Sequence, residues 1–176
     1  MLRTIATPTT VVLRALCMLH ITHTYLYEFT ETKGESMLPT LSSSNDYVHV
    51  LKKYRNGTGC QMGDCIVAVK PTDPSHRVCK RITGMPGDII LVDPSHLEDG
   101  PARFEQFIQV PKGHVWVTGD NLSHSLDSRS YNVLPMALIK GKIIAANDFT
   151  EPMRGNGEKR FGMFGFRWIK NTYLND

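Results

Sequence analysis

Several features that would assign a chain quickly to a class are scarce in this sequence. It has four cysteines in 176 residues, too few for a small scaffold built on disulfides. Its 20 Lys and Arg nearly balance 17 Asp and Glu, so no strong basic excess marks a nucleic-acid binder. It has no long uninterrupted apolar run, and its mean hydropathy is −0.23, which excludes a polytopic membrane protein. With 41% hydrophobic residues, the chain can bury the core of one domain that carries an appendage.

The first 27 residues differ from the rest of the chain. They contain Arg3 and Arg14, six threonines and no acidic residue, a composition that resembles a mitochondrial targeting segment. Within this segment, residues 15–27 form an apolar stretch that His20 and His23 interrupt. Two interpretations stay open for this stretch: an amphipathic or core helix, and a marginal single membrane span or anchor. We assign residues 1–29 to a targeting and membrane-anchor segment.

The remainder is typical of a mostly β protein. Short β-branched runs alternate with Gly, Pro and Asp turns, and no alternation of strands with helices predicts a parallel sheet. We therefore expect one antiparallel β domain over residues 30–150. Residues 151–176 form a tail that either folds back on the sheet or offers a partner surface. The expected strands are residues 46–51, 65–70, 76–83, 89–93, 104–110, 114–118 and 137–146.

Ser36 lies in a non-repetitive stretch that suits an exposed nucleophile. Gly34 before it permits close approach of a ligand to the backbone, and Pro39 after it stops a helix. Leu38 stands where a Gly-x-Ser-x-Gly elbow needs glycine, so that type of hydrolase is not indicated. Taken by itself, a serine in such a stretch is far more often an ordinary turn serine.

Lys80 carries more information because of its neighbours. On a strand it shares one face with Val78 and Ile82, and that face is expected to be inward. Burial disfavours the ammonium and lowers the pKa of a lysine, and a neutral amine takes a proton from a serine hydroxyl. The competing interpretation is an edge-strand lysine that reaches solvent along its stem.

The loop over residues 119–129 is crowded with small polar groups. Asp127 and Arg129 are close enough in sequence to form an ion pair that holds a bent loop. A hydroxyl from this loop, such as that of Ser125 or Ser128, would orient a neutral lysine by a hydrogen bond.

Four segments together resemble type I signal peptidases, the membrane proteases that use a Ser/Lys dyad. They are Ser-Met-Leu-Pro-Thr at 36–40, Met-Gly-Asp-Cys-Ile-Val at 62–67, the lysine segment at 80–88 and the loop at 119–129. The order matches the family, and the resemblance covers about residues 30–148. The acid-free N-terminus and the short length resemble the mitochondrial branch, the inner membrane proteases. This implies a signal-peptidase-like antiparallel β domain on a short N-terminal helical membrane segment.

The resemblance also implies roles for individual residues. Ser36 is the nucleophile and Lys80 the general base, Ser125 hydrogen-bonds the lysine, and Asp127 with Arg129 supports the loop beneath the site. The Ser36 N–H belongs to the oxyanion hole.

At other positions the sequence departs from relatives or adds detail. Gly34 stands where some bacterial relatives place a serine whose hydroxyl is a second oxyanion donor. That side-chain donor is missing here, so either another group or the Gly34 N–H would have to replace it. Met37 and Cys79 are expected to line the substrate pocket. Asn132 stands where bacterial relatives often have glycine, and residues 94–112 are too few for their large accessory domain.

The resemblance implies the setting as well. The expected substrates are precursor polypeptides with sorting presequences, cleaved at the inner membrane by a domain that faces the intermembrane space. A second, related protease subunit and membrane lipid are the expected partners, with no nucleic acid, metal or organic cofactor.

Three alternatives remain. The first is a self-cleaving repressor-type Ser/Lys protein, which would need an N-terminal DNA-binding unit that the apolar, acid-free N-terminus does not supply. The second is a non-catalytic partner subunit, in which Ser36 and Lys80 would be present but wrongly placed for catalysis. A Ser/His arrangement would use a histidine such as His124. The cysteine spacing matches no standard zinc site.

Overall fold

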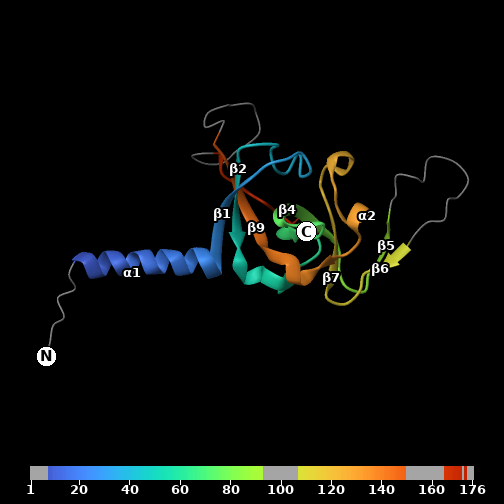
Figure 1. The fold of residues 1–176 in the computed structure, drawn as a ribbon. Helices are drawn as coiled ribbons and strands as arrows, with labels where there is room; N and C mark the ends of the chain where they lie inside the picture. Colours follow the sequence, from blue (N-terminus) through green and yellow to red (C-terminus); the bar gives the residue numbers. More distant parts are fainter. Residues whose placement is uncertain (1–7, 93–106, 150–164, 172, 174–176) are drawn as a thin grey trace, which may run out of the picture.

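The computed structural model describes residues 8–92, 107–149, 165–171 and 173. Helix α1 (Pro8–Ile21) continues through a further helical turn, η1 (Thr22–Leu26), and projects away from the rest of the molecule (Figure 1). None of its side chains is buried. Within the described ranges, no helix combines the length and apolar character needed to cross a membrane.

A curved antiparallel sheet forms the body of the domain (Figure 1). Its strand order is β1-β2-β9-β3-β4-β7-β8, and β10 pairs with β9. A separate hairpin joins β5 to β6. The strands are β1 (Tyr27–Thr32), β2 (Asp46–Leu51), β3 (Cys65–Lys70), β4 (Asp73–Gly84), β5 (Ile89–Leu91), β6 (Phe107–Gln109), β7 (His114–Thr118), β8 (Leu134–Pro135), β9 (Ile139–Asp148) and β10 (Arg167–Trp168). The short helical elements are η2 (Lys52–Gly57), η4 (Leu122–His124), α2 (Ser128–Tyr131) and η5 (Met136–Leu138).

The expected mostly β, antiparallel class is confirmed, and so are the strands at 46–51, 65–70, 76–83 and 114–118. The last long strand starts later than expected, at Ile139, because η5 occupies Met136–Leu138. Expected strand residues 93 and 104–106 lie outside the described residues. Strand β1 was not expected. It starts at Tyr27, directly after the apolar stretch, and pairs with β2 along its whole length.

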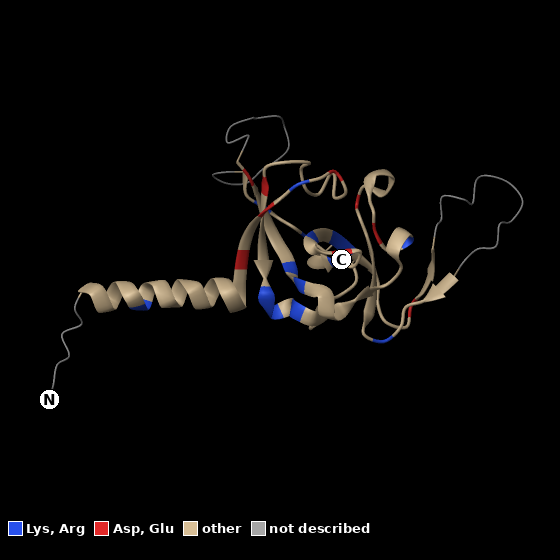
Figure 2. Cartoon of the chain, viewed as in Figure 1, with Lys and Arg blue, Asp and Glu red and all other residues tan. Residues whose placement is uncertain are grey.

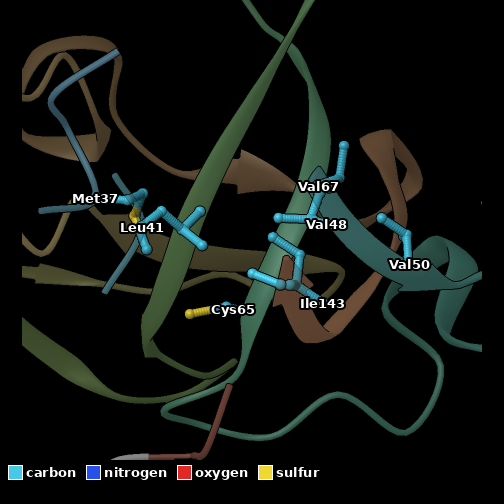
Figure 3. Packing of buried hydrophobic residues seen from close by; sticks show 8 residues of the cluster. Met37, Leu41, Val48, Val50, Cys65, Val67 and Ile143 are labelled. Atoms are coloured by element: carbon cyan, nitrogen blue, oxygen red, sulfur yellow. The ribbon is translucent and has the colours of Figure 1, made fainter. Parts of the chain in front are cut away.

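Two hydrophobic clusters lie on the two faces of β3. Cys65 and Val67 point to the first cluster, with Val48, Val50 and Ile143 (Figure 3). Ile66 and Ala68 point to the second, with Ile82, Val115, Val117 and Leu134. This explains why β3 reads as a continuous apolar run: both of its faces are covered. Truncating a fully buried side chain here, such as Ile66, costs about 2–5 kcal/mol.

The tail folds back on the sheet over its described part. Arg167 and Trp168 pair with Ala146 and Ala145 of β9. Asn171 donates to a carboxylate oxygen of Asp64, at 2.9 Å. Of the two interpretations left open by the sequence, the structure supports return to the sheet for residues 165–171; residues 151–164 lie outside the described part.

Candidate active site

Ser36 lies on a loop between β1 and β2 that is held from below by two apolar anchors. Met37 and Leu41 are 2% and 3% exposed and belong to the first hydrophobic cluster. Gly34 takes a φ of +113°, a conformation that disfavours side-chain-bearing residues. Its N–H donates to the Ser43 carbonyl at 2.8 Å. The loop thus presents a half-buried serine between a constrained glycine and a buried methionine.

The Gly34 hydrogen bond bears on the oxyanion hole. The donor expected to replace the missing serine hydroxyl is already committed to Ser43 within the loop. The Ser36 N–H, by contrast, has no hydrogen-bond acceptor among the described residues. The structure therefore leaves Ser36, and not Gly34, with a backbone donor that is available to an oxyanion.

Lys80 is buried, as the strand pattern predicted, with only 3% of its surface exposed. Its Nζ donates to the Ser125 hydroxyl at 2.9 Å. Burial lowers the pKa of Lys80, an effect that the nearby Asp127 carboxylate partly opposes. A larger share of the side chain is therefore neutral, and able to accept a proton, than in an ordinary surface lysine.

The Ser125 hydroxyl is oriented by a second hydrogen bond. Its Oγ donates to Asp127 Oδ2 at 2.6 Å. Because a hydroxyl has only one proton, Ser125 accepts from Lys80 and gives its own proton to Asp127. The lone pair of a neutral Lys80 amine is then left free for another hydroxyl.

Asp127 anchors this chain of hydrogen bonds. It is fully buried, and its Oδ1 accepts from Arg129 Nε at 2.9 Å, the ion pair that the sequence suggested. The Gly119 N–H donates to Oδ2 at 3.0 Å. Burial by itself raises the pKa of Asp127, but hydrogen bonds from Arg129, Ser125 and the backbone outweigh it, so the pKa lies below its usual range. The carboxylate is therefore ionised at neutral pH.

Gly119 lies between the serine loop and the lysine's partner. A Cβ added at Gly119 would come within 2.3 Å of the Ser36 carbonyl oxygen and 2.4 Å of Ser125 Oγ. Asn121 donates its N–H to the same Ser36 carbonyl at 3.1 Å. Ser36 and Ser125 thus both approach the side of Gly119 on which a side chain would project. No hydrogen bond joins Ser36 to Lys80 directly among the described residues.

Sequence reasoning missed a second polar group that ties the same segments together. The Arg81 guanidinium pairs with both carboxylate oxygens of Asp120, at 2.7 Å each, and donates to the Gly63 carbonyl at 2.7 Å. Thr40 donates its hydroxyl to Asp120 at 2.5 Å. Arg81 is 4% exposed. The sequence offered little signal, because Arg81 shares its face of the strand with Arg77, Cys79 and Thr83 and so resembles an exposed strand arginine.

A pocket of about 180 Å³ lies beside Ser36. Met37 and Cys79, both expected to line a substrate pocket, lie on its wall with Ser36. The rest of the wall includes Thr30–Thr32 of β1 and Arg77–Cys79 of β4. Each of these strand segments pairs with a strand on one side only, within the described part of the chain. Such edges can hydrogen-bond to an added extended peptide.

Other expected positions have clear structural settings. Asn132 has a φ of 69°, a conformation that glycine also adopts readily and that asparagine tolerates. His124 is exposed and hydrogen-bonds to Ser123 Oγ at 2.9 Å, so it does not support a Ser/His arrangement with Ser36. All four cysteines are free. Where the chain is described, no cluster of three or more His, Cys, Asp or Glu side chains could hold a metal ion.

Comparison with known proteins gives consistent matches. The model of the family "Signal peptidase, peptidase S26" matches residues 5–98 and 93–146. Mitochondrial inner membrane protease subunit 1 of Saccharomyces cerevisiae is 64% identical over 170 residues, which are 93% of this chain and 88% of that protein. Its human counterpart is 40% identical over 72% of this chain and 73% of its own length. Subunit 2 of the yeast protease is 34% identical over 65% of this chain and 64% of its own length.

Proposed function

The chain belongs to the signal peptidase family, peptidase S26, and is a serine peptidase; we propose that it cleaves with a dyad of Ser36 and Lys80. The observation that carries the proposal is the setting of the lysine. Lys80 is 3% exposed, has a lowered pKa, and donates to a hydroxyl whose own proton is held by Asp127. This arrangement suits a general base better than a solvated structural lysine.

In the proposed reaction the neutral Lys80 amine takes the Ser36 hydroxyl proton as Oγ attacks the scissile carbonyl carbon. The tetrahedral intermediate collapses as the Lys80 ammonium returns the proton to the leaving amine, so the peptide C–N bond breaks and an ester to Ser36 forms. Lys80 then removes a proton from water as the water oxygen attacks the ester carbonyl carbon. As the ester C–O bond breaks, the Lys80 ammonium returns that proton to Ser36 Oγ, so the acid is released and both the serine and the neutral amine are restored. No hydrogen bond joins Ser36 to Lys80 among the described residues, and hydrogen bonds of this kind often form only when substrate is bound.

The oxyanion is held at least by the Ser36 N–H, which has no other acceptor among the described residues. Gly34 contributes by shaping the loop, since its N–H is bound to Ser43. Loss of one oxyanion donor typically costs about 10²–10³ in rate. A preorganised backbone donor at the nucleophile itself is therefore a substantial part of the catalytic effect.

The substrate is proposed to bind as an extended segment between β1 and β4. Both strands border the pocket that contains Ser36, Met37 and Cys79. Main-chain hydrogen bonds to such edges give affinity, while side-chain pockets give selectivity. We assign Met37 and Cys79 to the wall that contacts the side chain before the scissile bond.

The names of the relatives indicate where the protein works. It is a peptidase of the mitochondrial inner membrane. We propose that its catalytic domain, residues 30–150, faces the intermembrane space and removes sorting presequences from precursors delivered there, while residues 1–29 target and anchor it. The similarity to subunit 2 of the yeast protease supports a related second subunit as the partner in a heterodimer.

The decisive experiment compares cleavage of a presequence-bearing precursor by the wild-type chain, Ser36→Ala and Lys80→Ala, each in complex with the second subunit and with that subunit's own nucleophile replaced. Both alanine variants should lose nearly all cleavage. His124→Ala is the matched control and should keep wild-type rates, because His124 is exposed and its ring hydrogen-bonds to its neighbour Ser123. Wild-type cleavage by either dyad variant would refute the assignment, and loss with His124→Ala would favour a histidine base.

A further inference from the structure

A small basic pocket lies where the N-terminal helix meets the sheet, away from the proposed dyad. Its volume is about 110 Å³. Its lining is mostly basic, with four cationic side chains and one carboxylate. Figure 2 shows Lys and Arg positions gathered at the lower left of the domain, beside the inner end of α1. The lining residues are Thr24, Glu28, Lys52, Arg55, Arg77 and Lys140.

Glu28 organises the pocket but does not neutralise it. Its two carboxylate oxygens pair with Lys52 at 2.8 Å and with Arg77 at 2.5 Å. Lys52 and Glu28 have side chains that are only 12% and 13% exposed. Neither Arg55 nor Lys140 has a carboxylate partner within the described ranges. The pocket therefore combines a fixed pair of cations with two that lack a counter-charge, a pattern that attracts an anion.

The pocket is also placed against the end of the helical segment. Lys52 Nζ donates to the His23 carbonyl at 2.7 Å, and Thr24 is part of the pocket wall. Along α1 the large apolar side chains are open to the surroundings, with Met18 at 73% and Leu19 at 66% exposed. In a protein of the inner membrane, an apolar helix of this kind is stabilised by contact with lipid. The end of such a helix, and the pocket with it, then lies at the level of the lipid headgroups.

We propose that this pocket binds the phosphate of an anionic phospholipid headgroup. The lipid's acyl chains would lie along α1 while its phosphate meets Arg55 and Lys140, which pair with no carboxylate in the described part of the chain. Basic pockets beside membrane-embedded helices bind anionic headgroups by this combination of charge and apolar contact. Arg77 lines both this pocket and the pocket beside Ser36, so a bound lipid would fix one wall of the substrate site.

The test uses the full chain in detergent micelles that contain equal amounts of phosphatidylglycerol and phosphatidylcholine. The phospholipid that co-purifies with the protein is quantified, and the ratio of the two lipids is the readout. The wild-type chain should be enriched in phosphatidylglycerol. Arg55→Gln combined with Lys140→Gln should lower that enrichment by about fivefold per charge removed.

The matched control is Lys112→Gln with Lys170→Gln, which removes the same charge from two exposed positions outside the pocket. It should keep the wild-type enrichment. Equal loss in the control, or none in the pocket variant, would overturn the proposal. A third arm adds 10-fold excess inorganic phosphate over lipid: if it abolishes the enrichment, the pocket is a site for free phosphate and the lipid assignment is wrong. A thermal melt of both variants reports that they are folded.

Discussion

The two halves of the proposed active site are held in different ways. Lys80 lies within a long strand of the sheet and is followed on that strand by two more buried residues, Arg81 and Ile82. Ser36 lies on a loop outside regular structure, and its position depends on contacts from other segments. The proposed base is thus positioned by the sheet itself, while the position of the proposed nucleophile depends on its own loop and on Asn121, which is far away in sequence. Four substitutions test how the lysine and the serine loop are each held in place.

The largest effect is expected where the two halves meet. Gly119→Ala places a methyl group within 2.4 Å of both the Ser36 carbonyl oxygen and Ser125 Oγ, so both segments must move. Displacements of about 1 Å in a catalytic site cost about 10²-fold, and here two groups are displaced. We expect cleavage to fall by about 10³-fold while the thermal melt still shows a folded domain. Near wild-type cleavage would mean that Ser36 and Ser125 need not approach this glycine.

Ser125→Ala probes the base half. Ser125 Oγ accepts from Lys80, and an acceptor favours the ammonium over the neutral amine. Its loss should lower kcat/KM by about 10²-fold, within the range of a positioned general base. It should also move the alkaline rise of the pH–rate profile to lower pH. Ser123→Ala is the control, since Ser123 is exposed and bonds only to Asn121 and His124; an unchanged profile in Ser125→Ala would remove its role in orienting Lys80.

Arg81→Lys probes the nucleophile half. Lysine keeps the charge but cannot reproduce the two-oxygen pairing with Asp120. Asp120 also holds Thr40 of the serine loop, so we expect the loop to loosen and kcat/KM to fall by about 10-fold. The midpoint of the pH–rate profile should stay in place, because Lys80 and Ser125 are untouched. A shifted midpoint would show that the two halves are not independently supported.

The smallest effect concerns stability. Because the pKa of Lys80 is lowered in the folded state, the unfolded chain binds more protons at this site between the lowered pKa and the usual value of about 10.4. The penalty for burying the lysine is therefore complete below that window and disappears above it. Lys80→Met should be more stable than the wild type by about 1 kcal/mol near neutral pH. Denaturant unfolding should show this difference shrinking as pH rises towards 10; a constant difference would contradict a lowered pKa.

The comparison also explains what the sequence could predict. The burial of Lys80 and the pairing of Asp127 with Arg129 follow from strand alternation and close spacing, which are local signals. The link from Arg81 to Asp120 spans 39 residues, and local periodicity carries no information about such a pairing. The same limit applies to the commitment of the Gly34 N–H to Ser43, since a backbone hydrogen bond leaves no side-chain signature.

Strand β1 and the tail were hard to predict for related reasons. β1 pairs with one strand and has half-buried residues alternating with more exposed ones, so its polar sequence resembles a linker. β10 has only two residues, too few for any periodic pattern. The proposed roles of Ser36 and Lys80 came from the order of four short segments, which is more specific than any one of them.

The return of the tail has a consequence for the order in which the protein becomes active. Arg167 pairs with the buried Asp46 and donates to the Thr40 carbonyl, at 3.3 Å from one of its guanidinium nitrogens, so it fastens the loop that carries Ser36. Because synthesis runs from the N-terminus, Ser36 and Lys80 are made before Arg167. The loop is therefore fastened only when the last segments have folded, and a nascent or truncated chain holds Ser36 less firmly.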